Sequence, residues 1–284
     1  MSPVLEDRHE HSDLSKGFPM IRVIKAELLR LVHRRTLLIT AAGALLFSLV
    51  AALSVFSSAE ATTSGVASRR GGTPLAALTG HGGGTEAFAV GASFVGFFVF
   101  VTFIALLASE FSGGTFRALL LREPHRLRVI VGKLAGILVV AAGAVAFAEA
   151  ATFVLSLLMA PTKDIATTDW FSLHSLADAG RDYATVFAGV AGWAIFGTTL
   201  AVIFRSTPIA LGVGFAWAGP FENITVDSWD AGYRFFPGQV LGSLIRGGTV
   251  ELGLGRALFT ATLYAAVAAT VTLALVSRRD VTAA

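Results

Sequence analysis

The sequence predicts an all-α integral membrane protein that forms one domain over residues 20–284. Three observations lead to this prediction: the composition is strongly apolar, the apolar residues gather into long runs, and the basic residues gather between particular runs. Hydrophobic residues make up 54% of the chain, charged residues only 14%, and the mean hydropathy is +0.71. Soluble domains carry about 25% charged residues. The polar side chains are therefore too few to cover a water-soluble surface.

Six apolar segments are predicted to be transmembrane helices. A helix needs about 20 apolar residues to cross roughly 30 Å of hydrocarbon at about 1.5 Å per residue. Five segments reach this length, whereas the segment 208–221 would reach only about 21 Å as a straight helix. The predicted spans are residues 36–56, 87–108, 134–159, 184–204, 208–221 and 257–276.

The distribution of Lys and Arg predicts the orientation of these spans. If the amino terminus is cytoplasmic and all six segments cross, the cytoplasmic pieces hold 15 of the 22 basic residues and the outer pieces hold seven. Cytoplasmic loops of membrane proteins carry such an excess of basic residues, so we expect both termini in the cytoplasm. Arg supplies 18 of the 22 basic residues, and Ala, Gly and Val abound, as in proteins from GC-rich bacterial genomes. The expected location is the bacterial plasma (inner) membrane.

Two different segments precede the first span. Residues 1–19 are rich in charged side chains and lack apolar periodicity, which predicts a disordered cytoplasmic tail. From Met20 to Arg35 apolar residues recur at spacings of three and four with basic residues between them, which predicts an amphipathic helix lying on the lipid headgroups. The alternative is a positively charged flank of the first span. The apolar positions are Ile21, Ile24, Leu28, Leu31 and Val32.

The connector between the second and third spans is more elaborate than a hairpin requires. The Ser-Gly-Gly stretch 112–114 is suited to end the membrane helix, Thr115 to cap a new short helix, and Pro124 to stop that helix after about two turns. A basic helix then runs through Gly132-Lys133 into the third span. The connector is therefore the segment that we expect to contact another protein.

The connector and the amphipathic helix resemble those of type 2 ABC exporter permeases, which are bacterial transporter subunits with six spans. The matching elements are Glu110, Gly114-Thr115, Arg117, Leu119–Leu121 and Gly132-Lys133, and the resemblance covers roughly residues 20–280. In that family the short helix docks into a cleft of a separate ATP-hydrolysing subunit. The resemblance implies this docking role for Gly114, Thr115, Phe116, Arg117, Leu119, Leu120 and Leu121. It also implies a cytoplasmic salt bridge between Glu110 and the arginines Arg30 and Arg34, the alternative being that Glu110 is an ordinary interfacial carboxylate.

Further candidate residues lie nearer the outer face. Members of the same family carry short re-entrant helices before the last span, and here Tyr233–Ile245 supplies two apolar pieces broken at Pro237-Gly238. An ordinary surface loop is the alternative. Glu149 is the one carboxylate well inside a predicted span, and an ionisable residue there indicates a functional site. The alternatives are that it pairs with Arg181 or lies near the outside water. The candidates for a substrate path or gate are Glu149, Phe94, Phe98, Phe236 and Pro237, the alternative for the phenylalanines of the second span being a lipid-facing or packing role.

The sequence has no Gly-x-x-x-x-Gly-Lys-Ser/Thr phosphate-binding loop, so we expect no ATP hydrolysis by this chain and no cofactor or metal bound to it. The resemblance implies two cytosolic ABC ATPase subunits that carry ATP and Mg, a second permease that is a copy or a related chain, and membrane lipids as partners. Nucleic acid is not expected. The predicted function is a permease subunit of an ATP-driven exporter for an amphipathic or lipid-like compound, such as a drug, a lipid or a peptide. Two alternatives stay open: a proton- or cation-coupled secondary transporter centred on Glu149, and a membrane immunity protein.

Overall fold

A computed structural model describes residues 19–59, 73–116, 119 and 125–278, and these residues form an all-α protein with no β-strand among them. The predicted tail 1–19 lies outside the described residues except for Pro19, which begins a helix. The long helices are α2 (Arg34–Ser58), α4 (Gly83–Ser112), α6 (Arg126–Met159), α7 (Leu173–Phe204) and α11 (Leu254–Arg278). The shorter elements are α1 (Pro19–Leu31), α3 (Leu75–Thr79), η1 (Ala160–Lys163), η2 (Thr168–Phe171), α8 (Thr207–Ala216), η3 (Trp217–Phe221), α9 (Glu222–Ser228), η4 (Asp230–Arg234) and α10 (Pro237–Ile245).

Four of these helices are long and apolar enough to cross a membrane, namely α2, α6 with its extension η1, α7 and α11. This confirms an all-α membrane protein. The predicted span 87–108 lies within the 30-residue helix α4, and the predicted span 208–221 is divided between α8 and the π-helical turn η3 that contains Pro220. The number of crossings, six, stays a prediction.

Two of the long helices begin well before the predicted spans. Helix α6 starts at Arg126, so the basic helix that was predicted to run through Gly132-Lys133 into the third span is present, and α7 starts at Leu173 instead of residue 184. The apolar run marks only the part of a helix that lies in hydrocarbon, whereas the helix itself continues into polar residues. At the start of α7, the Ser172 hydroxyl accepts a hydrogen bond from the Ser175 N–H at 3.1 Å and caps the helix.

The predicted amphipathic helix 20–35 is divided into two elements. Helix α1 ends at Leu31, and His33 has an extended backbone with φ −86° and ψ 141°. Arg34 then begins α2. The break at His33 lets the chain turn from the short basic helix into the first long apolar one.

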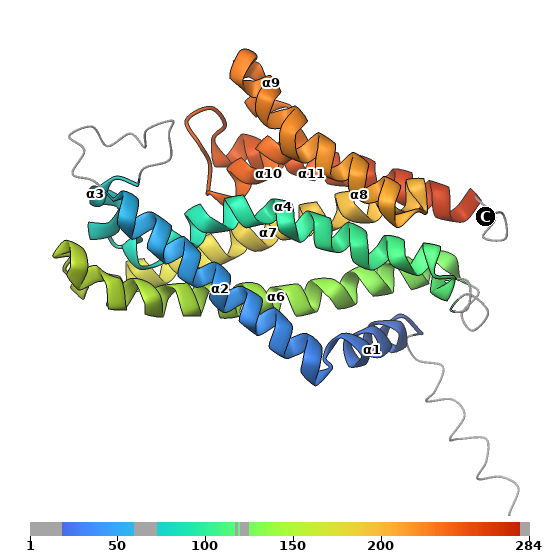
Figure 1. Ribbon diagram of the computed structural model, residues 1–284, viewed down its shortest axis with the longest axis horizontal. Helices are drawn as coiled ribbons and strands as arrows, with labels where there is room; N and C mark the ends of the chain where they lie inside the picture. Colours follow the sequence, from blue (N-terminus) through green and yellow to red (C-terminus); the bar gives the residue numbers. More distant parts are fainter. Residues whose placement is uncertain (1–18, 60–72, 117–118, 120–124, 279–284) are drawn as a thin grey trace, which may run out of the picture.

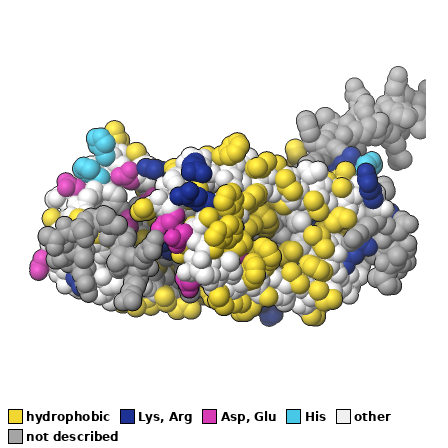
Figure 2. Space-filling view, turned by 90° about the horizontal axis from the view of Figure 1, so that it is seen from above, with side chains coloured by type: hydrophobic (Ala, Val, Ile, Leu, Met, Phe, Trp, Pro, Cys, Tyr) yellow, Lys and Arg dark blue, Asp and Glu magenta, His cyan; other side chains and the backbone are white. Residues whose placement is uncertain are grey.

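The long helices lie side by side along one axis (Figure 1). Helices α4, α6 and α7 form the centre, α2 crosses α6, and α8 leads through η3 into α9, which diverges from the bundle. The carboxyl ends of α4 and α11, the amino end of α6 and the short α1 gather at one end, at the right of Figure 1, and α3 lies at the other. Figure 2 shows a band of hydrophobic side chains with charged and histidine side chains mostly on either side of it, as expected for a protein in a bilayer.

Helix α10 is packed into the core and is not an ordinary surface loop. Its residues Leu241 and Ile245 are buried and face two glycines of α7. A Cβ on Gly189 would lie 2.2 Å from Ile245 Cγ1, and one on Gly192 would lie 2.5 Å from Leu241 Cδ2. Small residues of this kind let membrane helices approach closely. Whether α10 re-enters the membrane stays a prediction.

Candidate functional site

The connector begins where α4 ends, at Ser112. The Gly113 N–H donates to the Ser109 carbonyl at 2.8 Å, and Gly114 has a φ of +71°, which is the left-handed conformation that favours glycine. Thr115 is already helical, and its hydroxyl donates to the Glu110 carbonyl at 3.2 Å. Thr115 therefore binds back to the end of α4 instead of capping the start of the next helix.

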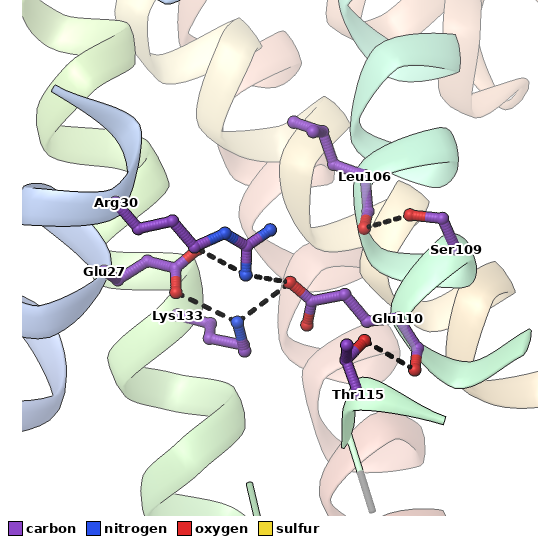
Figure 3. A network of polar contacts seen from close by, with 7 residues as sticks. All are labelled: Glu27, Arg30, Leu106, Ser109, Glu110, Thr115 and Lys133. Atoms are coloured by element: carbon purple, nitrogen blue, oxygen red, sulfur yellow. Dashed lines mark hydrogen bonds and ion pairs between the residues drawn. The ribbon is translucent and has the colours of Figure 1, made fainter. Parts of the chain in front are cut away.

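Four charged side chains meet behind this turn (Figure 3). Lys133 Nζ of α6 lies 2.9 Å from Glu27 Oε2 of α1 and 2.9 Å from Glu110 Oε1 of α4. Arg30 of α1 donates to the same Glu110 oxygen at 2.5 Å and lies 3.6 Å from Glu27 Oε1. We call these four residues the charge cluster. It joins three helices that are far apart in sequence.

The charge cluster is neutral in sum and mostly shielded from solvent. The side chains of Lys133, Glu27 and Glu110 are only 4%, 8% and 9% exposed, whereas that of Arg30 is 52% exposed. Partial burial acts to lower the pKa of the Arg30 guanidinium, but the hydrogen bond and the charge of Glu110 outweigh it and hold that pKa above its ordinary value. Removing the ammonium of Lys133 would leave Glu27 and Glu110 buried with only the half-exposed Arg30 as a counter-ion, which is strongly unfavourable.

Two glycines of α6 let α1 come close enough to form the cluster. A Cβ on Gly132 would lie 2.6 Å from Val23 Cγ1, and one on Gly136 would lie 3.0 Å from the Glu27 Cβ. Gly132 and Gly136 share one face of α6 because residues four apart lie one above the other. Helix α1 therefore rests directly on the backbone of α6, with Glu27 turned towards Lys133.

An apolar cluster anchors the other side of the connector. Phe116 is 4% exposed and packs with buried residues of three long helices, while its ring lies 4.5 Å from that of Phe111 in α4. Leu119 is partly buried against the same cluster. The buried members are Phe116, Val129, Ile130, Val202 and Val276. The connector is thus attached to α6, α7 and α11 as well as to α4.

The predicted docking and salt-bridge residues differ from one another in burial and in their contacts. The expected contact of Glu110 with Arg30 is present, whereas Arg34 is exposed at the start of α2 and forms no ion pair with Glu110 in the described part of the chain. Gly114 and Thr115 are exposed, Phe116 is buried, and Leu119 is partly buried. The predicted residues Arg117, Leu120 and Leu121 lie outside the described residues.

Sequence reasoning missed Glu27 and the pairing role of Lys133. Glu27 follows Ile24 by three positions and precedes Leu31 by four, so it lies on the apolar face of α1. A carboxylate on that face was a signal that a buried partner exists. Lys133 was assigned only to the start of the third span, and its two partners, 106 and 23 residues away, were not identifiable from spacing.

Glu149 lies on α6 in the half opposite the charge cluster. It follows Lys133 by 16 residues, which corresponds to about 24 Å along a helix. Its Oε1 atom is buried and has no hydrogen-bond partner among the described residues. It lines a cavity of about 600 Å³ between α6, η2 and the start of α7.

Of the other predicted path or gate residues, Phe98, Phe236 and Pro237 do not line this cavity. Phe98 is 55% exposed on α4, and the side chain of Phe94 is outside the described ones. Phe236 packs edge-on against Trp217, with ring centroids 6.4 Å apart, and Pro237 begins α10. Glu222, which sequence reasoning did not single out, is fully buried nearby and accepts a hydrogen bond from the Gln239 N–H at 3.2 Å. Phe236 and Pro237 therefore belong to a separate aromatic region where α9 meets α10.

Comparison with known proteins places the chain in a family. No curated protein matches the chain at a significant level. A family profile matches residues 44–281, which include the connector, Glu110, Lys133 and Glu149, and which begin inside α2, so that α1 lies outside the match. Because this profile covers most of the sequence, the chain belongs to the family described as "Protein of unknown function (DUF2705)".

Proposed function

We propose that this chain is the membrane subunit of an ATP-driven exporter and that its connector is the docking site for a separate ATP-hydrolysing subunit. The observation that carries the proposal is the way the connector is held. The charge cluster fixes the end of α4 to α1 and α6, while Phe116 fixes the connector to α6, α7 and α11. The turn residues Gly113, Gly114 and Thr115 are left exposed. A plain loop between two helices needs none of these attachments.

These attachments favour the transmission of a movement of the connector to the helices α1, α4 and α6. A partner that pushes on Thr115 acts on α4 through the hydrogen bond to the Glu110 carbonyl, and on α1 and α6 through the charge cluster. Buried ion pairs with good geometry are expensive to break, so the three helix ends would move as one body. The resemblance of Glu110, Gly114-Thr115 and Gly132-Lys133 to type 2 ABC exporter permeases supports the same role.

The remaining parts of the proposal follow from that resemblance. ATP and Mg bind to two cytosolic ATPase subunits, and a second permease, identical or related, completes the translocation path. The cargo is an amphipathic or lipid-like compound, and the location is a bacterial plasma membrane with both termini in the cytoplasm. The excess of Lys and Arg in the segments assigned to the cytoplasm supports this orientation.

Site-specific photocrosslinking in native membranes tests the docking role. A photoreactive residue at Thr115, which is exposed on the connector, should capture an ATPase with a phosphate-binding loop. The matched control is Thr162, which is exposed in η1 at the opposite end of α6. Capture of the ATPase at position 115 and not at 162 supports docking. Absence of an ATPase at position 115, or equal capture at both positions, would overturn the proposal.

One observation favours a second candidate, a proton- or cation-coupled secondary transporter. Glu149 has a buried carboxylate oxygen without a described partner on a helix long enough to span the membrane. Such residues mark ion pathways in many transporters. The purified chain in proteoliposomes should then transport the cargo when a proton or sodium gradient is imposed, without an ATPase. Glu149→Gln should stop this transport. Transport that requires ATP and the partner would exclude this candidate.

A further inference from the structure

The cavity beside Glu149 has mostly apolar walls. At about 600 Å³ it falls within the size range of small-molecule sites, which is about 300 to 1,000 Å³. Three aromatic residues form one side: the Phe153 ring lies 5.9 Å from that of Phe171, nearly perpendicular to it, and 6.4 Å from that of Trp170. Gly84 of α4 makes room for this arrangement, since a Cβ there would lie 2.5 Å from Phe153 Cε2. The packing of α4 against α6 therefore accommodates this group of aromatic side chains.

Most polar groups around the cavity are already satisfied by the protein. The Trp170 indole N–H donates to the Leu78 carbonyl at 3.1 Å, and the Ser175 hydroxyl donates to the Trp170 carbonyl at 2.6 Å. The Thr85 hydroxyl donates to Asp182 Oδ2 at 2.7 Å. Glu149 differs from these residues, because its buried Oε1 has no hydrogen-bond partner in the described structure.

Other carboxyl groups lie near Glu149. Asp182 of α7 is close enough to act electrostatically on both Glu149 and Glu86 of α4, and Asp178 acts on Asp182. Arg181 is the basic residue that acts on Asp182. No ion pair joins Arg181 to Glu149 within the described ranges, although the two residues lie on neighbouring helices. A cationic ligand would therefore be attracted to this group of carboxyls.

We propose that this cavity binds an organic ammonium group carried on an apolar body, with Glu149 as the counter-ion and Phe153, Trp170 and Phe171 as the aromatic wall. Ammonium groups are recognised by aromatic faces combined with negative charge. The apolar walls suit the rest of an amphipathic molecule, and the side chains of Phe171 and Leu176 are exposed beside the cavity. The same chemistry is present in a free amphipathic amine and in the ethanolamine headgroup of a lipid.

Equilibrium binding of a defined probe tests the proposal without any ATPase partner, so its outcome is independent of the proposed function. The probe is radiolabelled dodecylammonium, whose N–H groups can donate to the Glu149 carboxylate, bound to the full chain immobilised in an uncharged maltoside detergent. Glu149→Gln should weaken binding by about tenfold or more, because a charge-assisted contact is lost. Phe153→Leu should weaken it by about threefold, because the aromatic face is lost while most of the volume is kept. Asp227→Asn, an exposed carboxylate on α9, is the control and should change binding by less than about twofold.

Two results would overturn the proposal: Glu149→Gln binding the probe as tightly as the unmodified chain, or an uncharged dodecyl analogue competing as well as the cation. Thermal unfolding of each variant in the same detergent separates loss of the site from loss of the fold. Native mass spectrometry identifies the source of the ammonium. An ethanolamine lipid that is retained by the unmodified chain, lost from Glu149→Gln and displaced by the probe assigns the site to a lipid. Specific probe binding with no retained lipid assigns it to a free amphipathic amine.

Discussion

The ammonium of Lys133, near the start of α6, lies 2.9 Å from the carboxylate of Glu110, near the end of α4. The two residues flank the connector, so this ion pair closes the segment between them into a loop with fixed ends. Glu27 is held by the same ammonium at the same distance, which adds α1 to the closure. The exposed turn at Gly114 therefore projects from a segment whose two ends are held together by these ion pairs.

Lys133→Met should destabilise the chain strongly. The substitution keeps the length of the side chain but leaves Glu27 and Glu110 buried with only the partly exposed Arg30 as a counter-ion, and we expect a loss of about 3 to 5 kcal/mol in the free energy of unfolding. Arg30→Gln should cost less than about 1 kcal/mol, because that side chain is half exposed. Unfolding by denaturing detergent in mixed micelles measures both. Equal losses for the two variants would contradict the burial argument.

Gly132→Ala should loosen the contact between α1 and α6. The new Cβ would lie 2.6 Å from Val23 Cγ1 and 3.0 Å from Val23 Cβ, which a short branched side chain cannot relieve by rotation alone. We expect a loss of about 1 to 3 kcal/mol and faster hydrogen exchange in α1. Gly143→Ala, on the same helix with nothing within 4 Å, is the matched control and should be neutral or slightly stabilising. The double change Val23→Ala and Gly132→Ala should restore most of the lost stability, and failure to do so would place the clash elsewhere.

Gly114→Ala should strain the connector without any steric clash. A Cβ at Gly114 would have nothing within 4 Å, but the φ of +71° costs about 1 to 2 kcal/mol for a residue with a side chain. The strain should appear as faster amide exchange at Thr115 and Phe116. Gly114→Asn should show a smaller effect, because Asn tolerates the left-handed conformation. Gly180→Ala in α7, which is equally open but helical, should show no strain.

Ser48→Ala should weaken the contact between α2 and α6 modestly. The Ser48 hydroxyl is fully buried and donates to the Ala148 carbonyl at 3.0 Å. Hydrogen bonds between membrane helices contribute about 0.6 kcal/mol on average, so the expected loss of stability is of that size. Ser57→Ala is the control on the same helix, because its hydroxyl donates to the Ser54 carbonyl of its own helix. A larger loss for Ser57→Ala would show that the interhelical bond is not the determinant.

The long helices were predictable because each contains an apolar run of membrane length. The basic helix that leads into the third span was also predicted, and α6 does begin at Arg126. The start of α7 at Leu173 was not predicted, because hydropathy does not report a helix in polar sequence. Of the candidate site, the contact between Glu110 and Arg30 followed from the resemblance. The burial of Glu27 and the position of Lys133 between two carboxylates depend on how α1 lies on Gly132 and Gly136, which no local pattern encodes.

The cavity beside Glu149 was likewise predictable from the sequence only in part. A carboxylate inside an apolar run indicated a site, and Glu149 does line a cavity. The aromatic residues around this cavity are Phe153, Trp170 and Phe171, whereas Phe236 packs with Trp217 in another region. A role of Phe236 in a path or gate stays a prediction. Trp170 and Phe171 belong to the short turn η2, and only the tertiary contact of η2 with α6 brings them there.

The members of the charge cluster are far apart in the sequence, so they are synthesised and brought together in a fixed order. Glu27 is synthesised 106 residues before Lys133, and Glu110 is synthesised 23 residues before it. While the ribosome is still making the connector, neither carboxylate has its buried counter-ion, and both stay hydrated at the membrane surface. Insertion of α6 delivers the ammonium, and only then can α1 settle onto Gly132 and Gly136. Helix α6 therefore completes the contact between α1, α4 and α6, and a nascent chain that stops before it would expose two carboxylates for quality control to recognise.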